Sequence, residues 1–222
     1  MDKELRVLVC LPTYNEEAAI AEMIQQLKQT GYAFIITDGG SEDATCKIAK
    51  QAGIPVLERP GMGKGAGVKQ AIQYAHTNNF THLVTIDCDL TYPVDRIHDL
   101  VEAAKDKDMV IAARNMQKIK WLNRQANYLF TFAINLLYGG YFHDTQSGMR
   151  IIKLEAFNGL VTVDNFDIET ELSCKALALK LKVGEIQVGY YDRIGESKVS
   201  ITDAFVILYR IFYCLFTSPK TK

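Results

Sequence analysis

The stretch His82-Leu83-Val84-Thr85-Ile86-Asp87-Cys88-Asp89 decides the fold class of this chain. Residues 82–86 form a short, largely apolar run, which is typical of a strand buried inside a sheet. Two carboxylates one residue apart, Asp87 and Asp89, follow at the mouth of that strand. They are either part of a solvated turn or ligands of a hard divalent cation that keeps its remaining coordination sites for phosphate oxygens. The second explanation predicts a protein that handles a phosphorylated or nucleotide substrate.

Strand signals and helix signals alternate through the first half of the chain. Asn15 and Ser41 are the predicted N-caps of the first two helices. Strands separated by helices of this length predict βαβ units, and hence an α/β fold with a mixed, mostly parallel sheet flanked by helices. Ligands of such sheets bind beyond the carboxyl ends of the strands, which is where the polar motifs fall. The predicted strands cover residues 5–11, 33–37, 55–57, 82–86 and 109–113.

Two loops in this half contain residues suited to binding a nucleotide. Asp38-Gly39-Gly40-Ser41 joins a strand to a helix, where glycines permit close approach of the backbone and the helix N-terminus favours anions. Asp38 can accept hydrogen bonds from a base or ribose, although an ordinary strand-to-helix loop explains the same residues. Residues 61–67 predict a mobile glycine-rich loop with one lysine, Lys64. This loop is not a Walker A motif, because no Ser or Thr follows the lysine.

The second half of the chain contains two strongly apolar helical segments. Residues 121–138 predict a helix that is apolar on nearly every face from Tyr128 onward. Residues 204–216 form an apolar run broken only by Arg210. As a helix this run covers about 20 Å, which is less than the roughly 30 Å of a hydrocarbon core. Both segments either lie in a membrane interface, with Arg210 snorkelling, or pack on the sheet or in a dimer interface. The other predicted elements are strands at 147–152 and 183–191 and a helix at 168–179.

Composition limits the class of protein. The chain has 222 residues, 48% of them apolar and 23% charged, as expected for one large globular domain or a domain with an appendage. The net charge of −1 argues against nucleic-acid binding, so any anion site must be built locally. Five cysteines without a CxxC motif predict reduced thiols in a cytosolic setting, with Cys88 a buried filler. The charged start predicts no signal peptide.

Positive charge for an anionic substrate comes mainly from the second half. Arginine forks bind phosphate oxygens through paired hydrogen bonds, although each arginine alone is more often a surface residue. The segment from Arg193 to Lys198 is more specific, because Gly195 and Ser197 between two cations suit a loop that wraps a phosphate. The candidate cations are Arg114, Arg124, Arg150, Arg193 and Lys198.

Five motifs, in this order, resemble those of the family 2 glycosyltransferases. The resemblance covers roughly residues 5–200, and the matching branch is the polyprenyl-phosphate (dolichyl-phosphate) mannosyl and glucosyl synthases. The first and third motifs identify the broad family, and the last two point to the branch. The motifs are Leu11-Pro12-Thr13-Tyr14-Asn15-Glu16, Asp38-Gly39-Gly40-Ser41-Glu42-Asp43-Ala44-Thr45, Asp87-Cys88-Asp89, Asp144-Thr145-Gln146-Ser147-Gly148-Met149-Arg150 and Arg193-x-Gly195-x-Ser197-Lys198.

The resemblance implies a GT-A (Rossmann-like) fold and an inverting, metal-dependent enzyme. It implies transfer of mannose or glucose from a GDP-sugar or UDP-sugar to a polyprenyl or dolichyl phosphate. Asp87 and Asp89 are the implied ligands of Mg²⁺ or Mn²⁺, with Asp89 the main one. The implied nucleotide-binding residues are Pro12, Tyr14, Glu16, Asp38, Lys64 and Asp87. The implied acceptor and phosphate-binding residues are Arg114, Arg124, Arg150, Arg193, Ser197 and Lys198. The implied catalytic set is Asp89, Arg114, Arg193 and Asp144.

The resemblance also divides the chain and suggests a location. Residues 1–115 are the expected nucleotide-sugar half and 116–200 the acceptor half of one domain, and 201–222 are an expected membrane-interfacial helix. A lipid acceptor implies a peripheral protein on the cytoplasmic face of a membrane, with a homodimer or a membrane-anchoring partner as further expectations. Two departures leave the sugar and the base open. Gly39 stands where the family often has a second acid, and Thr91 stands where mannosyl synthases often carry Gln.

Two other functions stay open at this point. A phosphate monoester is largely anionic at neutral pH and needs no strong base to attack the sugar. A family 2 enzyme acting on a saccharide hydroxyl needs such a base, and Asp144 is then the candidate. A catalytically silent nucleotide-sugar-binding subunit of a membrane complex would bind without turnover. A sugar nucleotidylyltransferase is disfavoured, because residues 11–17 lack the glycine and lysine of its signature loop.

Overall fold

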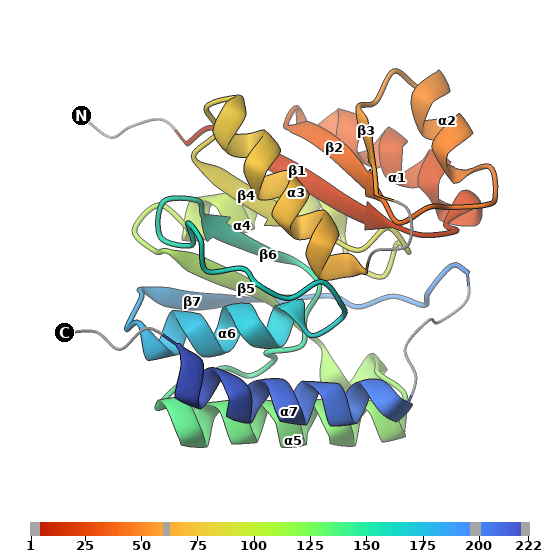
Figure 1. The fold of residues 1–222 in the computed structure, drawn as a ribbon. Helices are drawn as coiled ribbons and strands as arrows, with labels where there is room; N and C mark the ends of the chain where they lie inside the picture. Colours follow the sequence, from red (N-terminus) through yellow and green to blue (C-terminus); the bar gives the residue numbers. More distant parts are fainter. Residues whose placement is uncertain (1–4, 60–62, 196–200, 219–222) are drawn as a thin grey trace.

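The computed structural model describes residues 5–59, 63–195 and 201–218, which form one seven-stranded sheet with helices around it (Figure 1). The strands are β1 Val7–Thr13, β2 Ala33–Asp38, β3 Val56–Glu58, β4 His82–Thr85, β5 Met109–Arg114, β6 Arg150–Lys153 and β7 Val183–Val188. The helices are α1 Glu17–Thr30, α2 Thr45–Gln51, α3 Lys64–Thr77, α4 Ile97–Ala103, α5 Trp121–Tyr138, α6 Ile168–Ala178 and α7 Ile201–Thr217, with 3₁₀ turns η1 Val94–Arg96 and η2 Met116–Lys118.

The sheet has the strand order β3-β2-β1-β4-β6-β5-β7. Its neighbouring strands are parallel except that β6 runs antiparallel to both β4 and β5. The predicted mixed, mostly parallel sheet is therefore confirmed. β2 and β3 lie on one side of β1, and β4 to β7 lie on the other, so the chain changes direction at β1. Such a switch point leaves a crevice at the carboxyl ends of the central strands.

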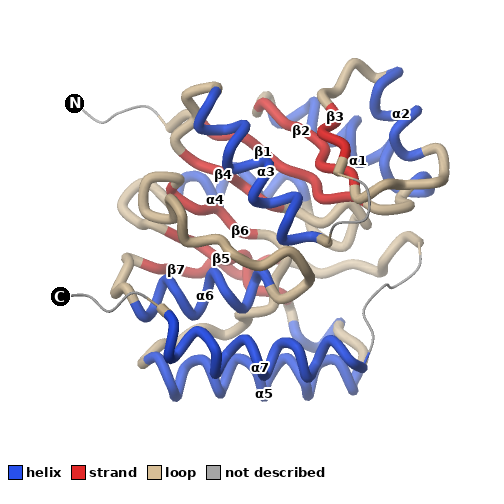
Figure 2. The backbone as a smooth tube through the Cα atoms, in the orientation of Figure 1, coloured by secondary structure: helices blue, strands red, loops and turns tan. Residues whose placement is uncertain are grey.

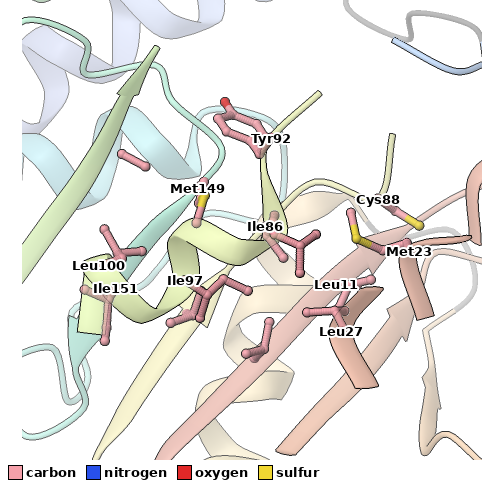
Figure 3. Close-up of a cluster of buried hydrophobic side chains, with 14 of the residues drawn as sticks. Leu11, Met23, Leu27, Ile86, Cys88, Tyr92, Ile97, Leu100, Met149 and Ile151 are labelled. Carbon is pink, nitrogen blue, oxygen red and sulfur yellow. The ribbon is translucent and has the colours of Figure 1, made fainter. Parts of the chain in front are cut away.

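Helices cover both faces of the sheet, because its central strands are apolar on both sides. On one face, Met23 and Leu27 of α1 and Ile97 of α4 belong to a cluster with Leu11 of β1 (Figure 3). Cys88 lies in the same cluster and is 2% exposed, which confirms its predicted burial. On the other face, α3 and α6 pack over the sheet. Burying one large aliphatic side chain stabilises a fold by about 1.5–3 kcal/mol, so these two clusters account for much of the stability.

α5 and α7 lie side by side and form a separate layer next to α6 (Figures 1 and 2). They pack through a small cluster in which Phe130 and Ile134 of α5 meet Ile211 and Cys214 of α7. Both predicted apolar helices are therefore present, and α7 begins at residue 201 rather than 204. Within the residues that the structure describes, no helix is long and apolar enough to cross a membrane.

The turn after β1 corrects the predicted helix caps. α1 begins at Glu17, and Asn15 precedes it with a positive φ of 51°. The cap comes instead from a distant loop, since Asp43 Oδ2 accepts a hydrogen bond from the Glu17 backbone N–H at 3.1 Å. Asn15 Oδ1 accepts from the backbone N–H of Glu42 at 2.9 Å, so the turns after β1 and β2 are held together. α2 likewise begins at Thr45, and its N-cap is Ala44 and not the predicted Ser41.

Candidate active site

Candidate residues that are far apart in the sequence meet at the carboxyl edge of the sheet. Glu16 follows β1, Asp87 and Asp89 follow β4, Arg114 ends β5, and Arg193 follows β7. These strands, β1, β4, β5 and β7, point the same way, so their carboxyl ends bring the side chains together at one edge of the sheet.

Arg193 forms ion pairs with two carboxylates, those of Asp89 and Glu16. Arg193 Nη1 lies 2.9 Å from Asp89 Oδ2, and Arg193 Nη2 lies 3.0 Å from Glu16 Oε1. The other Asp89 oxygen accepts hydrogen bonds from the backbone N–H of Thr91 at 3.1 Å and from its hydroxyl at 2.6 Å. Burial and the nearby charge of Asp87 nevertheless raise the pKa of Asp89 above its usual value. The two carboxylates therefore repel each other, and an additional cation between them would relieve this repulsion.

Asp87 forms a second ion pair of the same kind with Lys64. Lys64 Nζ lies 2.5 Å from Asp87 Oδ1 and 2.6 Å from Glu169 Oε1 at the start of α6. Burial raises the pKa of Asp87, but the charge and hydrogen bond of Lys64 outweigh it and hold the pKa below its usual value. The predicted mobile loop is wrong for residues 63–67, because Gly63 is the N-cap of α3 and residues 64–67 form its first turn. Residues 61 and 62 lie outside the described part.

Asp87 and Asp89 can supply only some of the ligands that a divalent cation needs. Carboxylate oxygens are the donors that Mg²⁺ and Mn²⁺ prefer, and Mg²⁺ commonly binds one or two of them together with phosphate oxygens and water. Among residues 5–59, 63–195 and 201–218 there is no group of three or more His, Cys, Asp or Glu side chains placed to hold a metal. The chemistry of Asp87 and Asp89 therefore fits an ion that takes its remaining ligands from water or from the oxygens of a diphosphate.

Asp144 is committed to Arg114, which corrects its prediction as a base. Arg114 Nε donates to Asp144 Oδ2 at 2.6 Å, and Nη2 donates to Oδ1 at 2.9 Å. The Asp144 side chain is fully buried, and that of Arg114 is 9% exposed. The guanidinium also lies over the ring of Tyr190, with 5.4 Å between Cζ and the ring centroid. Asp144 thus orients Arg114 at the end of β5 and does not present a free carboxylate to a substrate.

Arg150 is a structural residue, which corrects its prediction as a phosphate ligand. Its side chain is 1% exposed. Nη1 donates to the backbone oxygen of Glu169 at 3.0 Å and to the Ser173 hydroxyl at 3.2 Å. Nη2 donates to the backbone oxygens of Thr145 and Ser147 at 3.0 and 2.7 Å. These bonds fasten β6 to the first turns of α6 and leave no accessible fork for a phosphate.

The predicted nucleoside residues lie at the ends of β1 and β2. Pro12 is half-buried, Tyr14 is exposed, and Glu16 is buried beside Arg193. Asp38 is 1% exposed, and its oxygens accept from the backbone N–H groups of Gly40 and Ser41 and from two hydroxyls. In the structure Asp38 therefore shapes its own loop. A contact of Pro12, Tyr14, Glu16 or Asp38 with a nucleoside stays a prediction.

The remaining phosphate-binding predictions are less defined. Arg124 lies in the first turn of α5 and is partly exposed. Its predicted role stays a prediction. Ser197 and Lys198 lie outside the described residues.

Sequence reasoning missed three residues that shape this site: Glu169, Tyr92 and Gly148. Glu169 occupies the first turn of α6, where an acidic residue is ordinary, so its contact with Lys64 had no signal in the sequence. The buried Tyr92 hydroxyl accepts a hydrogen bond from the Gly148 backbone N–H at 2.7 Å. Gly148 lies inside a motif that was recognised, but its contact with Asp87 depends on the pairing of β4 with β6.

Comparison with known proteins identifies the family of this chain. A family model described as glycosyl transferase family 2 matches residues 8–160. The chain belongs to glycosyl transferase family 2. This glycosyltransferase is 29% identical over 197 residues to the "Dolichyl-phosphate hexose transferase" of Haloferax volcanii, a match that covers 86% of this chain and 85% of that protein. It is 25% identical to the "Undecaprenyl-phosphate 4-deoxy-4-formamido-L-arabinose transferase" of Aeromonas hydrophila, over 96% of this chain and 68% of that protein.

Solved structures show the fold of this glycosyltransferase. The glucosyl-3-phosphoglycerate synthase of Mycobacterium tuberculosis, crystallised with uridine diphosphate, aligns with a TM-score of 0.75 over 97% of this chain and 81% of that chain. The sequence identity is 19%. A crystal of the same synthase with Mn²⁺, uridine diphosphate and glucosyl-3-phosphoglycerate aligns with a TM-score of 0.74. The GT-A fold of the family 2 glycosyltransferases that the motifs implied is therefore confirmed.

Proposed function

We propose that this glycosyltransferase transfers a hexose, either mannose or glucose, from a GDP-sugar or UDP-sugar to a polyprenyl phosphate such as dolichyl phosphate. The transfer inverts the configuration at C1 and uses Mg²⁺ or Mn²⁺. The named relatives support a polyprenyl-phosphate acceptor. The Asp87–Asp89 pair supports a donor that binds with a metal. In this proposal residues 1–115 hold the donor and residues 116–200 the acceptor.

The observation that carries the lipid acceptor is an apolar surface on α5 and α7. In water, a large contiguous apolar patch marks a site of interaction with a membrane or another protein. One alternative had Arg210 snorkel, but its Nε lies 2.6 Å from Asp167 Oδ2, so the outer surface of α7 keeps little charge. We name as the α5/α7 face the exposed residues Trp121, Leu122, Leu129, Phe132, Leu136, Phe205, Tyr209, Phe212 and Phe216.

The α5/α7 face is joined in the chain to the arginines of the site. α5 follows β5, which ends at Arg114, and α7 follows the segment that carries Arg193. Both helices begin on the side of the molecule towards which β1 points (Figure 1). A lipid phosphate can therefore approach the arginines while its chain stays in a membrane interface. All five cysteines, which lie in the described part, are free, and this supports the cytoplasmic face of that membrane.

The chemistry proposed for the site needs positioning more than proton transfer. A phosphate monoester has a second pKa of about 6 and is already a nucleophile at neutral pH. Arg114, held by Asp144, and Arg193, held by Glu16, would orient the acceptor and donor phosphates and screen their mutual repulsion. Asp87 and Asp89 would hold the divalent ion, which stabilises the departing nucleoside diphosphate when bound.

A transfer assay tests this proposal. Membranes or short polyprenyl phosphate would be incubated with radiolabelled UDP-glucose or GDP-mannose and Mg²⁺ or Mn²⁺, with Asp89→Asn as the inactive control. Label that enters the organic phase, and is lost in the variant, supports the proposal and identifies the donor. Label that appears only in a water-soluble saccharide would favour a hydroxyl acceptor. Metal-dependent nucleotide binding without any product would favour a silent subunit of a membrane complex.

A further inference from the structure

Each carboxylate of the Asp87–Asp89 pair is bound to a cation that another carboxylate also holds. Asp89 and Glu16 share Arg193, and Asp87 and Glu169 share Lys64. Glu169 is buried and Lys64 is largely covered, with side chains 10% and 11% exposed. The relation between Lys64 and Glu169 was not expected from the motifs, and the proposed transfer does not by itself explain it.

The backbone around Lys64 is built for this contact. A Cβ on Gly63 would lie 2.6 Å from the backbone oxygen of Asp164, and one on Gly65 would lie 2.5 Å from that of Val163. The backbone N–H of Gly65 donates to the oxygen of Asn165 at 3.1 Å. The glycines on both sides of Lys64 therefore let α3 begin directly against residues 163–165, the segment that leads into α6.

The Glu169 side of the contact is fixed as well. Arg150 Nη1 donates to the backbone oxygen of Glu169 at 3.0 Å, which anchors the first turn of α6 to β6. Asp167, which precedes Glu169 by two residues, is bound by Arg210 of α7. Lys64 and Glu169 thus meet because the start of α3 packs against the segment that leads into α6, and the ammonium lies between Glu169 and Asp87.

We propose that Glu169 is a positioning residue that holds Lys64 as an exchangeable counter-ion of Asp87. Lys64 neutralises Asp87 while no divalent ion is bound. With a divalent ion bound, Asp87 would be released from the ammonium, and Glu169 would retain Lys64 beside the site, where it would face the donor diphosphate. This proposal rests on the metal-dependent function proposed above. It explains why a lysine that looks like a nucleotide ligand in the sequence is bound between two acids in the structure.

The direct test measures how fast Lys64 is modified by a lysine reagent, using mass spectrometry, with and without Mn²⁺. In the native chain Mn²⁺ should raise the rate at Lys64 on the order of tenfold, the usual size of coupling between two linked sites. Glu169→Gln should raise the rate without Mn²⁺, because Asp87 alone then holds the ammonium. Lys69, which lies on the same helix as Lys64 but pairs with Asp164, is the internal control and should not respond.

A second measurement is the affinity for Mn²⁺, obtained by titration without donor or lipid. Lys64→Met should bind Mn²⁺ on the order of tenfold more tightly than the native chain, since no ammonium competes for Asp87. Glu169→Gln should bind it more weakly. Glu102→Gln is the control, because it removes a carboxylate that pairs with a lysine, Lys105, on the exposed surface of α4, and it should leave the Mn²⁺ affinity unchanged.

Either of two results would overturn the proposal. One is a modification rate at Lys64 that changes neither with Mn²⁺ nor with the Glu169→Gln substitution. The other is a Lys64→Met variant whose Mn²⁺ affinity equals or falls below that of the native chain, including the case in which neither binds the ion. The native-chain measurement needs no variant, so a misfolded mutant does not prevent the test. These experiments contain no lipid or sugar donor, so they fail or succeed independently of the transfer assay.

Discussion

The backbone of Gly148 packs directly against the carboxylate of Asp87. A Cβ atom on Gly148 would lie 2.0 Å from Asp87 Oδ2. The glycine cannot move away easily, because its N–H donates to the Tyr92 hydroxyl at 2.7 Å and its carbonyl accepts from the Thr85 hydroxyl at 3.3 Å. One face of the candidate metal ligand is therefore set by the backbone of the motif that leads into β6.

Gly148→Ala should inactivate the enzyme while leaving it folded. The added methyl group must displace the Asp87 carboxylate, and a misplacement of about 1 Å in a catalytic site costs on the order of 100-fold in rate. Transfer rates and Mn²⁺ affinity would be compared with those of the native chain. Gly184→Ala is the matched control, because its Cβ would crowd the flexible end of the Lys107 side chain and make an ordinary contact with Val110, so it should keep full activity. A Gly148→Ala enzyme with native activity would show that Asp87 is not needed in this position.

Asp144→Asn should above all lower the free energy of unfolding. The change leaves the buried guanidinium of Arg114 without its counter-charge, and breaking a buried pair in this way costs about 3–5 kcal/mol. Chemical denaturation would measure the loss. The double change Arg114→Met with Asp144→Asn should cost less than Asp144→Asn alone, because no unpaired charge is left. If Asp144→Asn is as stable as the native chain yet loses transfer with an altered pH profile, Asp144 is a base and a hydroxyl acceptor becomes the better hypothesis.

Asp38 should make stability depend on pH in the acid range. Burial raises the pKa of Asp38, but hydrogen bonds from Ser41 and Gly40 outweigh it and hold the pKa below its usual value. A lowered pKa contributes stability that is present above the unfolded pKa of about 3.9 and is lost as pH falls through the folded pKa. Asp38→Asn should therefore be less stable than the native chain at neutral pH, and the difference should shrink below about pH 4. The midpoints of urea denaturation of both proteins would be measured from neutral pH to below about pH 4. A stability difference that stays constant with pH would contradict the prediction.

The α5/α7 face should bind lipid vesicles. Phe132→Glu with Phe212→Glu removes two exposed aromatic side chains, each contributing about 1.5–3 kcal/mol if fully buried in the interface. Vesicle co-sedimentation should drop while the melting temperature stays the same. Gln73→Glu on the exposed side of α3 is the control that adds charge elsewhere. If the double variant instead loses a dimer seen by light scattering, with vesicle binding absent in both proteins, the face is a subunit interface.

Local patterns predicted the fold well and the contacts of charged residues poorly. The strands β1, β2, β4 and β5 are largely apolar runs of consecutive residues, so the local sequence predicts that they are buried. The antiparallel placement of β6 between β4 and β5 is a choice of distant partners, and no local pattern encodes it. The cap of α1 was missed for the same reason, because Asp43 provides it from another loop.

Charged residues in motifs were the main source of error. Arg150 and Asp144 have the residue types of a phosphate ligand and a base, but backbone oxygens surround the first and Arg114 binds the second. The glycines around Lys64 suggested mobility, whereas two of them serve close packing against residues 163–165. Which charged residue pairs with which depends on the three-dimensional arrangement. The sequence therefore indicated the members of this site but not their ion pairs.

The ion pair between Glu16 and Arg193 has a consequence for how the protein is made. The two residues are 177 positions apart. At about 5–20 residues per second, a ribosome needs roughly 10–35 seconds to add Arg193 after Glu16. The nascent chain carries Glu16 throughout that interval, and Asp87 and Asp89 during its later part, without the arginine that finally binds Glu16 and Asp89. The catalytic edge is thus completed late in translation, and a product released before residue 193 lacks one of its two bridging cations.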